Sequence, residues 1–95
     1  MVIQNDYSPK RREDLLKRDL EDGCVLYDEK TSQVYTLNTT AALIWEYCDS
    51  KTSIEQIAEE LADASDSKKE EMIEDVRKII TDFHKKGLLH TESEN

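Results

Sequence analysis

The sequence predicts an α+β domain in which a three-stranded antiparallel sheet is followed by three helices (β-β-β-α-α-α). Three short runs of strand-forming residues with turn signals between them occupy residues 15–37, and three helical patterns with capping residues occupy residues 38–87. The chain has 95 residues, which is the size of one domain. We expect a flexible arm over residues 1–10, a single folded domain over residues 11–90 and a frayed tail over residues 91–95.

The first strand is predicted from its context. The segment KRREDLLKRDL consists mostly of helix formers, and Leu16 and Leu20 have helical spacing. However, the turn signal EDG follows at once and leads into the strand-like CVLYD. This order favours a strand from about Leu15 to Leu20, and a helix over residues 11–20 is the alternative.

The next two strands form a hairpin. CVLYD and QVYTL are rich in Val, Tyr and Leu, and a polar loop of four or five residues joins them. Because side chains alternate along a strand, Val34 and Thr36 face one side of the sheet, and the other residues of QVYTL face the opposite side.

Capping residues mark the start of each helix. Asn38 precedes an apolar helix over Thr39–Cys48, in which Trp45 is expected to anchor the core. Capping boxes precede the second and third helices, and the third ends at Gly87 after Lys68–Lys86. The candidate boxes are Thr52 with Glu55 or Ser53 with Gln56 for the second helix, and Ser67 with Glu70 for the third.

The third helix is apolar along more than one line. The stripe expected to pack in the core contains Met72, Val76, Ile79 and Phe83. Beside it lie Ile73 and Ile80, with Arg77 and His84 just beyond. Two interpretations stay open: this second line packs in the core, or it lines a groove between the third helix and the last strand.

The composition excludes several classes of function. A net charge of −9 disfavours binding to nucleic acids and to anionic membranes. No apolar run is long enough to span a bilayer, and the two cysteines, Cys24 and Cys48, are too few for a disulfide scaffold, so we expect a cytoplasmic protein with buried, inert thiols. No metal-ligand spacing, cofactor motif or nucleophile with an adjacent base is present, so we expect neither a metal, nor a cofactor, nor catalysis.

The last strand is a candidate for strand addition. An unprotected sheet edge is a template for another strand, and QVYTL contains neither proline nor lysine. An extended peptide could therefore pair with this edge while its alternate side chains contact the third helix. Covering of the edge by the N-terminal arm is the alternative.

The stretch LYDEKTSQVYTLNTTAALIWEYCDSKTSIEQIAEEL, continuing to DVRKIITDFHKKGLL, resembles the PqqD-like family. The shared features are a hairpin ending in Leu-Asn, an apolar helix with Trp, a Ser- or Thr-capped helix, and a long helix closing in Lys-Gly-Leu. The resemblance covers about Leu15 to Leu89. One departure is Asp49-Ser50, where the family has Asp-Gly, and a different backbone conformation is expected there.

The resemblance implies a winged-helix-like, non-catalytic recognition element for ribosomally made, modified peptides. It implies a monomer or weak dimer, whose partners are the leader segment of a precursor peptide and a modifying enzyme such as a radical SAM enzyme, a cyclase or a protease. The leader would be an added strand between the third strand and the third helix. The implied peptide-binding residues are Gln33, Val34, Tyr35, Thr36 and Leu37 of the strand, and Ile73, Val76, Arg77, Ile80 and His84 of the helix.

Two other functions remain as alternatives. A winged helix that binds DNA has a compatible topology, but its recognition helix should be rich in basic and amide side chains. The second helix, SIEQIAEELADA, instead carries four acidic residues and Gln56. The other alternative is an adaptor that scaffolds enzymes without contacting a peptide.

Overall fold

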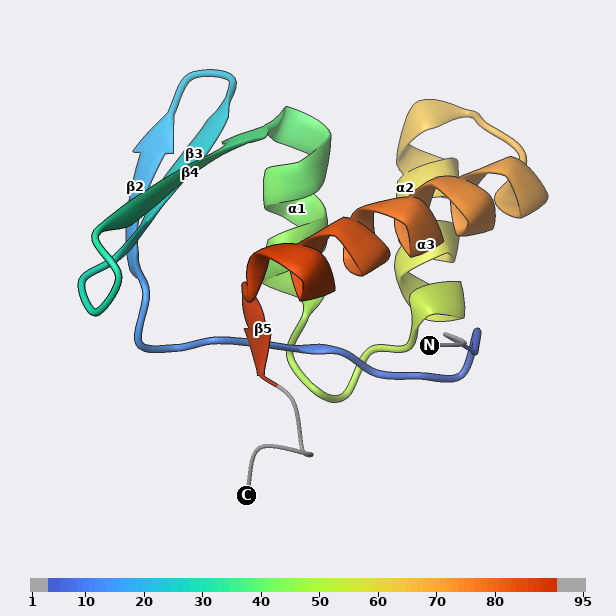
Figure 1. Cartoon of the computed structure of the whole chain (residues 1–95). Helices are drawn as coiled ribbons and strands as arrows, with labels where there is room; N and C mark the ends of the chain where they lie inside the picture. Colours follow the sequence, from blue (N-terminus) through green and yellow to red (C-terminus); the bar gives the residue numbers. More distant parts are fainter. Residues whose placement is uncertain (1–3, 91–95) are drawn as a thin grey trace.

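The computed structural model describes residues 4–90 of the chain (Figure 1). Residues 1–3 of the predicted arm and the whole predicted tail, 91–95, lie outside the described residues. The elements in chain order are β1 (Lys10–Arg11), β2 (Leu16–Leu20), β3 (Gly23–Asp28), β4 (Gln33–Asn38), α1 (Thr39–Tyr47), α2 (Ile54–Ser65), α3 (Lys69–Lys86) and β5 (Leu89–His90).

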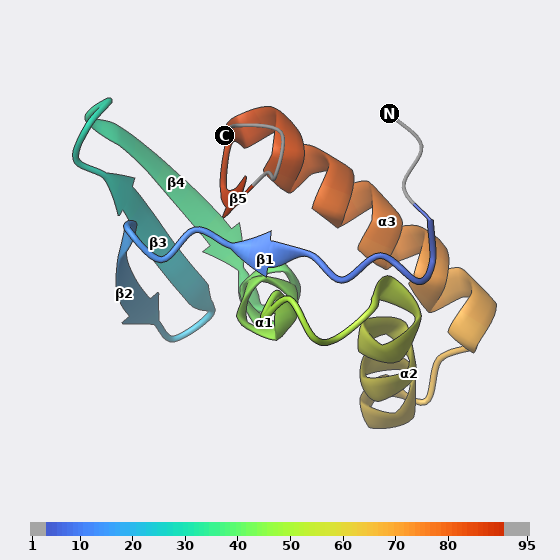
Figure 2. The same ribbon diagram turned by 90° about the horizontal axis from the view of Figure 1, so that it is seen from below.

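The predicted three-stranded antiparallel sheet is confirmed. Its strand order is β2-β3-β4, and the register aligns Lys17, Leu26 and Tyr35 across the three strands. The segment over residues 16–20 is therefore a strand, despite its helical propensity. All three helices lie to one side of this sheet (Figures 1 and 2).

Helix α1 joins the sheet to the other helices. It begins as predicted, because the Asn38 side chain accepts a hydrogen bond of 2.9 Å from the amide of Ala41. Ile44 and Trp45 are buried, and the indole Nε1 donates to the carbonyl oxygen of Leu88 at 3.3 Å. Since α1 contacts β3, β4 and α3, it acts as a spacer between the sheet and α3.

Helix α2 begins with one of the two predicted capping boxes. The Ser53 hydroxyl accepts from the amide of Gln56, and the Gln56 side chain accepts from the amide of Ser53. Thr52 instead donates through its amide and its hydroxyl to the carboxylate of Asp49. The box of Thr52 with Glu55 is therefore not formed.

The predicted capping box of Ser67 with Glu70 is wrong. Lys68 is the N-cap of α3 and makes no side-chain capping bond. Ser67 belongs to the end of α2, because its amide donates to the carbonyl of Ala62 and its hydroxyl bonds with Ser65. The preceding Asp66 is left-handed, with φ of 58°, and this conformation closes α2 before α3 starts.

Left-handed residues also occur at the end of α3 and in the loop between α1 and α2. Gly87 ends α3 with φ of 71°, as predicted. Ser50 has φ of 68°, which is a conformation that glycine adopts more readily than serine. The backbone at Asp49-Ser50 is therefore one that an Asp-Gly pair adopts easily.

The N-terminal segment makes contacts that the sequence did not indicate. β1 pairs with β5, and the amides of Ile54 and Glu55 donate to the carbonyls of Tyr7 and Asn5 at 2.9 and 3.0 Å. Pro9 is fully buried. Residues 5–11 thus run along the ends of α1 and α2, away from β4 (Figure 1).

The two thiols are unpaired and buried, as expected. Burial raises the pKa of both, and that of Cys48 reaches about 12. Both thiols therefore stay protonated near neutral pH, and neither has the properties of a nucleophile.

Candidate functional site

The outer edge of β4 is open. Within residues 4–90 no strand pairs with β4 on the side away from β3. The opposite edge of the sheet, β2, has the sequence LKRDL, whose charges oppose pairing with another strand. The sequence of β4, QVYTLN, contains no charged residue. Of the two edges, β4 is the one suited to accept a further strand.

A groove lies beside this edge, between β4 and α3. It has a volume of about 560 Å³ and is lined by the second half of β4, the first turn of α1 and one face of α3. The spacer helix α1 separates the two walls, as Figure 1 shows. An extended segment paired with β4 would therefore lie between β4 and α3.

The floor of the groove is apolar. It consists of Leu37 from β4, Ala41 from α1, and Met72, Ile79 and Phe83 from α3. Leu37 and Phe83 are buried, whereas the other three are only partly buried and leave apolar surface exposed. A bound extended segment that covers this surface with its own apolar side chains would gain binding free energy.

The α3 rim of the groove is charged. Asp82 and Lys86 lie one turn apart and form an ion pair of 2.9 Å. Asp75 and Lys78 also line the groove, and neither forms an ion pair with any residue in the described part of the chain. Lys78 is therefore available to pair with a carboxylate of a bound extended segment.

Of the strand residues implied by the resemblance, Thr36 and Leu37 line the groove. Val34 is 60% exposed and faces away from the buried side of the sheet, since it has the opposite parity to Leu37. Gln33 is exposed and Tyr35 is half-buried. All five lie on the open strand, where every second residue directs its backbone N–H and C=O away from β3 and within reach of an added strand.

The implied residues of α3 lie elsewhere. Val76 and Ile80 are fully buried in the core, so the placement of Ile80 beside the core stripe is wrong. Ile73, Arg77 and His84 do not line the groove. The reason is that α3 packs on two sides, against α2 and against α1, and its groove face is the line through Met72, Ile79 and Phe83, which the sequence assigned to the core.

His84 contacts the N-terminal segment. Its ring stacks on Tyr7 with centroids 5.9 Å apart, and its Nε2 lies within 3.3 Å of the Tyr7 hydroxyl. Partial burial lowers the pKa of His84. These two contacts attach the segment around Tyr7 to α3.

Met72 and Ile79 line the groove, although the sequence assigned both to the core stripe of the third helix. Periodicity identified Met72 and Ile79 as apolar, but it could not tell which apolar line of α3 faces the core. The signal was present in the sequence, because the helix carries two apolar lines and one helix face can pack in the core only where another element covers it. Only the position of the sheet shows which line is left uncovered.

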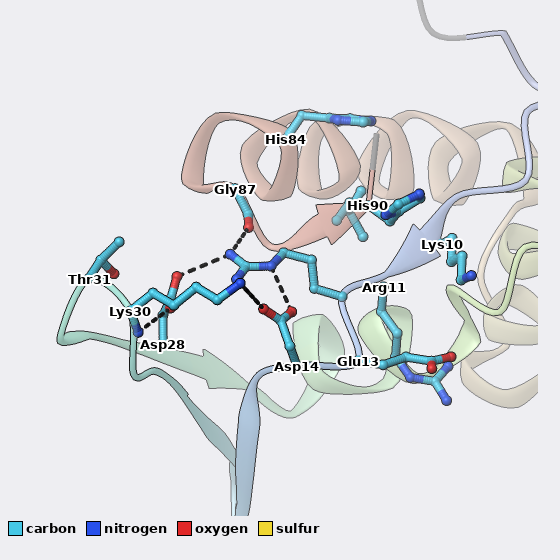
Figure 3. A pocket seen from close by; sticks show the side chains of 12 residues that line it. Lys10, Arg11, Glu13, Asp14, Asp28, Lys30, Thr31, His84, Gly87 and His90 are labelled. Carbon is cyan, nitrogen blue, oxygen red and sulfur yellow. Dashed lines mark hydrogen bonds and ion pairs between the residues drawn. The ribbon is translucent and has the colours of Figure 1, made fainter. Parts of the chain in front are cut away.

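A second cavity, of about 750 Å³, lies between the β3–β4 turn and the β1–β5 ribbon (Figure 3). At its centre Arg12 donates to the carboxylates of Asp14 and Asp28 and to the carbonyl of Gly87, at 2.8–3.1 Å. The hydrogen bonds from Arg12 lower the pKa of Asp14. For Asp28, burial acts to raise the pKa, but hydrogen bonds from Arg12 and from the Lys30 amide lower it overall. Because these charges satisfy one another, the cluster joins the connection between β1 and β2 to β3 and to the end of α3, and it leaves little free charge for a ligand.

Two further features are absent from residues 4–90. No group of three His, Cys, Asp or Glu side chains is arranged to hold a metal ion. None of the helices in residues 4–90 combines the length and hydropathy of a membrane-spanning segment.

Known structures share this fold. TbiB1 in complex with the TbiA(beta) leader peptide is 18% identical, with a TM-score of 0.75 over 85% of this chain and 94% of that one. Lasso peptide synthetase B1 complexed with the leader peptide is 22% identical, with a TM-score of 0.74 over 88% and 99%. The PqqD truncation of Methylobacterium extorquens PqqCD, described as a functional and stand-alone RiPP recognition element, is 17% identical, with a TM-score of 0.78 over 95% and 96%.

Sequence comparison gives the family. A search of curated protein sequences found no match. The family model for coenzyme PQQ synthesis protein D (PqqD) matches residues 23–89, which include the sheet from β3 onward, all three helices and the first residue of β5. Because this match covers more than half of the chain, the chain belongs to the PqqD family.

Proposed function

We propose that this chain is a non-catalytic recognition element that binds the leader segment of a ribosomally made precursor peptide as a fourth strand on β4. The observation that carries the proposal is the open, uncharged edge of β4 next to an apolar groove. Backbone hydrogen bonds to β4 would provide general affinity, and the groove would select apolar side chains at alternate positions. Two proteins of this fold are known as complexes with leader peptides.

The proposed contacts come from both walls. Gln33–Leu37 would offer its backbone to the peptide, and Leu37, Met72, Ile79 and Phe83 would contact the apolar side chains. Lys78 would pair with an acidic residue of the leader. Of the helix residues implied by the family resemblance, the buried Val76 and Ile80 would support this surface from below without contacting the peptide.

The bound leader would be presented to a modifying enzyme that performs the chemistry. Burial raises the pKa of both thiols, which supports a role without catalysis by cysteine. That the two cysteines are unpaired is compatible with a reducing compartment such as the cytoplasm. DNA binding is disfavoured, since the outward face of α2 presents Glu55, Glu59 and Glu60 rather than basic side chains. A gel shift at low salt with mixed DNA duplexes should therefore show no retention.

Titration with the precursor peptide encoded beside the chain tests the proposal. Calorimetry should give a dissociation constant in the micromolar range or tighter, and amide shifts in NMR spectra should cluster in Val34–Leu37 and around Ile79. A peptide with the same composition in scrambled order is the control. Absence of heat together with unchanged amide signals on β4 would refute the proposal.

A matched pair of lysines tests the rim. Lys78→Glu should weaken binding of a leader with an acidic residue at that point by about threefold to tenfold, as expected for a partly exposed ion pair. Lys85→Glu makes the same charge change on the same helix at an exposed site outside the groove, and it should leave the dissociation constant unchanged. Equal effects of the two variants would mean that only net charge matters.

A further inference from the structure

The sheet has a second face, which no helix covers. On this outer face the register aligns Leu16, Tyr27 and Val34 in one row across the three strands. The neighbouring row on the same face contains Arg18, Val25 and Thr36, and Thr36, on the edge strand, also borders the groove. We call these six residues the outer face, and all three helices lie on the other side of the sheet (Figures 1 and 2).

The outer face exposes more apolar surface than a solvated sheet usually does. Antiparallel sheets with one face in water normally place polar side chains on that face. Here Leu16 is 54% exposed and Val34 is 60% exposed, on either side of the half-buried Tyr27. Among the described residues, the large apolar side chains that are exposed lie only on β2, β4 and α1. Such a concentration is typical of an interaction surface.

The charge of the chain is unevenly divided. Residues 10–38, which form β1 and the sheet, contain six basic and seven acidic residues, whereas residues 39–90 contain seven basic and twelve acidic ones. The sheet is thus nearly neutral, and the helices carry most of the negative charge. Arg18 on the outer face forms no ion pair within residues 4–90. A partner surface with a carboxylate opposite Arg18 would complement it.

We infer that the outer face docks the enzyme that modifies the bound peptide, through an apolar patch on that enzyme with an Asp or Glu opposite Arg18. This inference rests on the proposed function, because it takes the peptide to be a strand on β4. An added strand would extend the outer face beyond Val34 and Thr36, so that one partner could contact the sheet and the outward side chains of the peptide together. The peptide side chains that point into the groove would still contact α3.

Other occupants fit less well. Two copies of this chain would each bring a net charge of −9, and this repulsion opposes self-association. The same charge opposes an anionic membrane. An enzyme surface is not subject to this constraint, and the exposed Val34 lies on β4 beside the proposed peptide site, so one partner could contact the outer face and the peptide together.

The test measures two affinities on each variant of the full chain: that for the precursor leader, and that for the purified modifying enzyme encoded with it. Leu16→Glu and Arg18→Glu change β2, which lies at the edge farthest from the peptide. Each should weaken enzyme binding about tenfold or more, as for residues central to an interface, and should leave leader affinity and the thermal midpoint unchanged. Leu43→Glu, at an α1 side chain that is 47% exposed and off the outer face, is the matched control and should change neither affinity.

The outcomes separate the two proposals. If no variant and not even the unmodified chain binds the leader, the proposed function fails. If the leader binds but Leu16→Glu and Arg18→Glu leave enzyme affinity unchanged, the outer face is not the docking surface. An equal loss with Leu43→Glu would move the contact to α1. Sedimentation that shows a dimer abolished by Leu16→Glu would assign the face to a second copy instead.

Discussion

Ile79 and Ile80 offer a direct comparison of a groove residue with a core residue. They are adjacent on α3 and have the same side chain, but Ile79 lines the groove and is partly exposed, whereas Ile80 is fully buried. Replacing each by alanine removes the same atoms from two different environments. We expect Ile79→Ala to weaken peptide binding and Ile80→Ala to weaken the fold.

The magnitudes follow from burial. Truncating a fully buried isoleucine costs roughly 2–5 kcal/mol of the free energy of unfolding, because it loses transfer free energy and leaves a cavity. Ile79 is partly covered in the free chain, so Ile79→Ala should lower the free energy of unfolding by about half as much. The rest of its surface would be covered by the peptide, and at about 0.8 kcal/mol per buried methylene-sized group its loss is worth about 1–1.5 kcal/mol, or about tenfold in the dissociation constant.

Urea denaturation and peptide titration measure the two effects separately. Titrations are performed at a temperature where circular dichroism shows that both variants are folded, so that loss of folded protein is not mistaken for loss of affinity. Unchanged affinity in Ile79→Ala would refute the groove assignment. A folded Ile80→Ala variant with an equal loss of affinity would show that the peptide contacts the face of α3 that the sequence first indicated.

Three further predictions concern the fold itself. Gly23→Ala should lower the free energy of unfolding in urea by about 2–3 kcal/mol, because Gly23 has φ of 145° and a Cβ there would lie 1.8 Å from the carbonyl oxygen of Leu37; an unchanged midpoint would contradict this geometry. Burial lowers the pKa of His84, so the unfolded state binds the proton more tightly, and the thermal midpoint should fall as pH drops through about 6.5. His84→Gln should reduce that fall, and an identical pH profile would assign it to other groups. Cys24 and Cys48 should react with a thiol reagent only after unfolding, and rapid labelling of native protein would show that one of them is accessible.

The sequence predicted best where local signals and the final packing agree. The hairpin of β3 and β4 has strand-forming residues on both sides of a polar loop, and Asn38 has the side chain needed to cap α1. The capping box of Ser53 with Gln56 was one of two that the sequence offered for this helix, and it is the one that forms. Each of these features depends on residues close together in the chain.

The features that were missed depend on contacts between distant residues. The pairing of β1 with β5 joins Lys10 to His90, and each strand has only two residues, so neither has a pattern of its own. The same limit applies to the site on α3. Helical periodicity shows that Ile79 and Ile80 are both apolar, but which of them is covered depends on where α1 and α2 pack.

The position of α1 has a kinetic consequence for recognition. Because this helix already holds the two walls of the groove apart, the groove is formed before a peptide enters. Almost all of the conformational entropy that is lost on binding is then lost by the peptide. Association in stopped-flow experiments should be a single phase whose rate rises linearly with peptide concentration, at about 10⁵–10⁷ M⁻¹s⁻¹. Leaders that differ in affinity would therefore differ mainly in their dissociation rates.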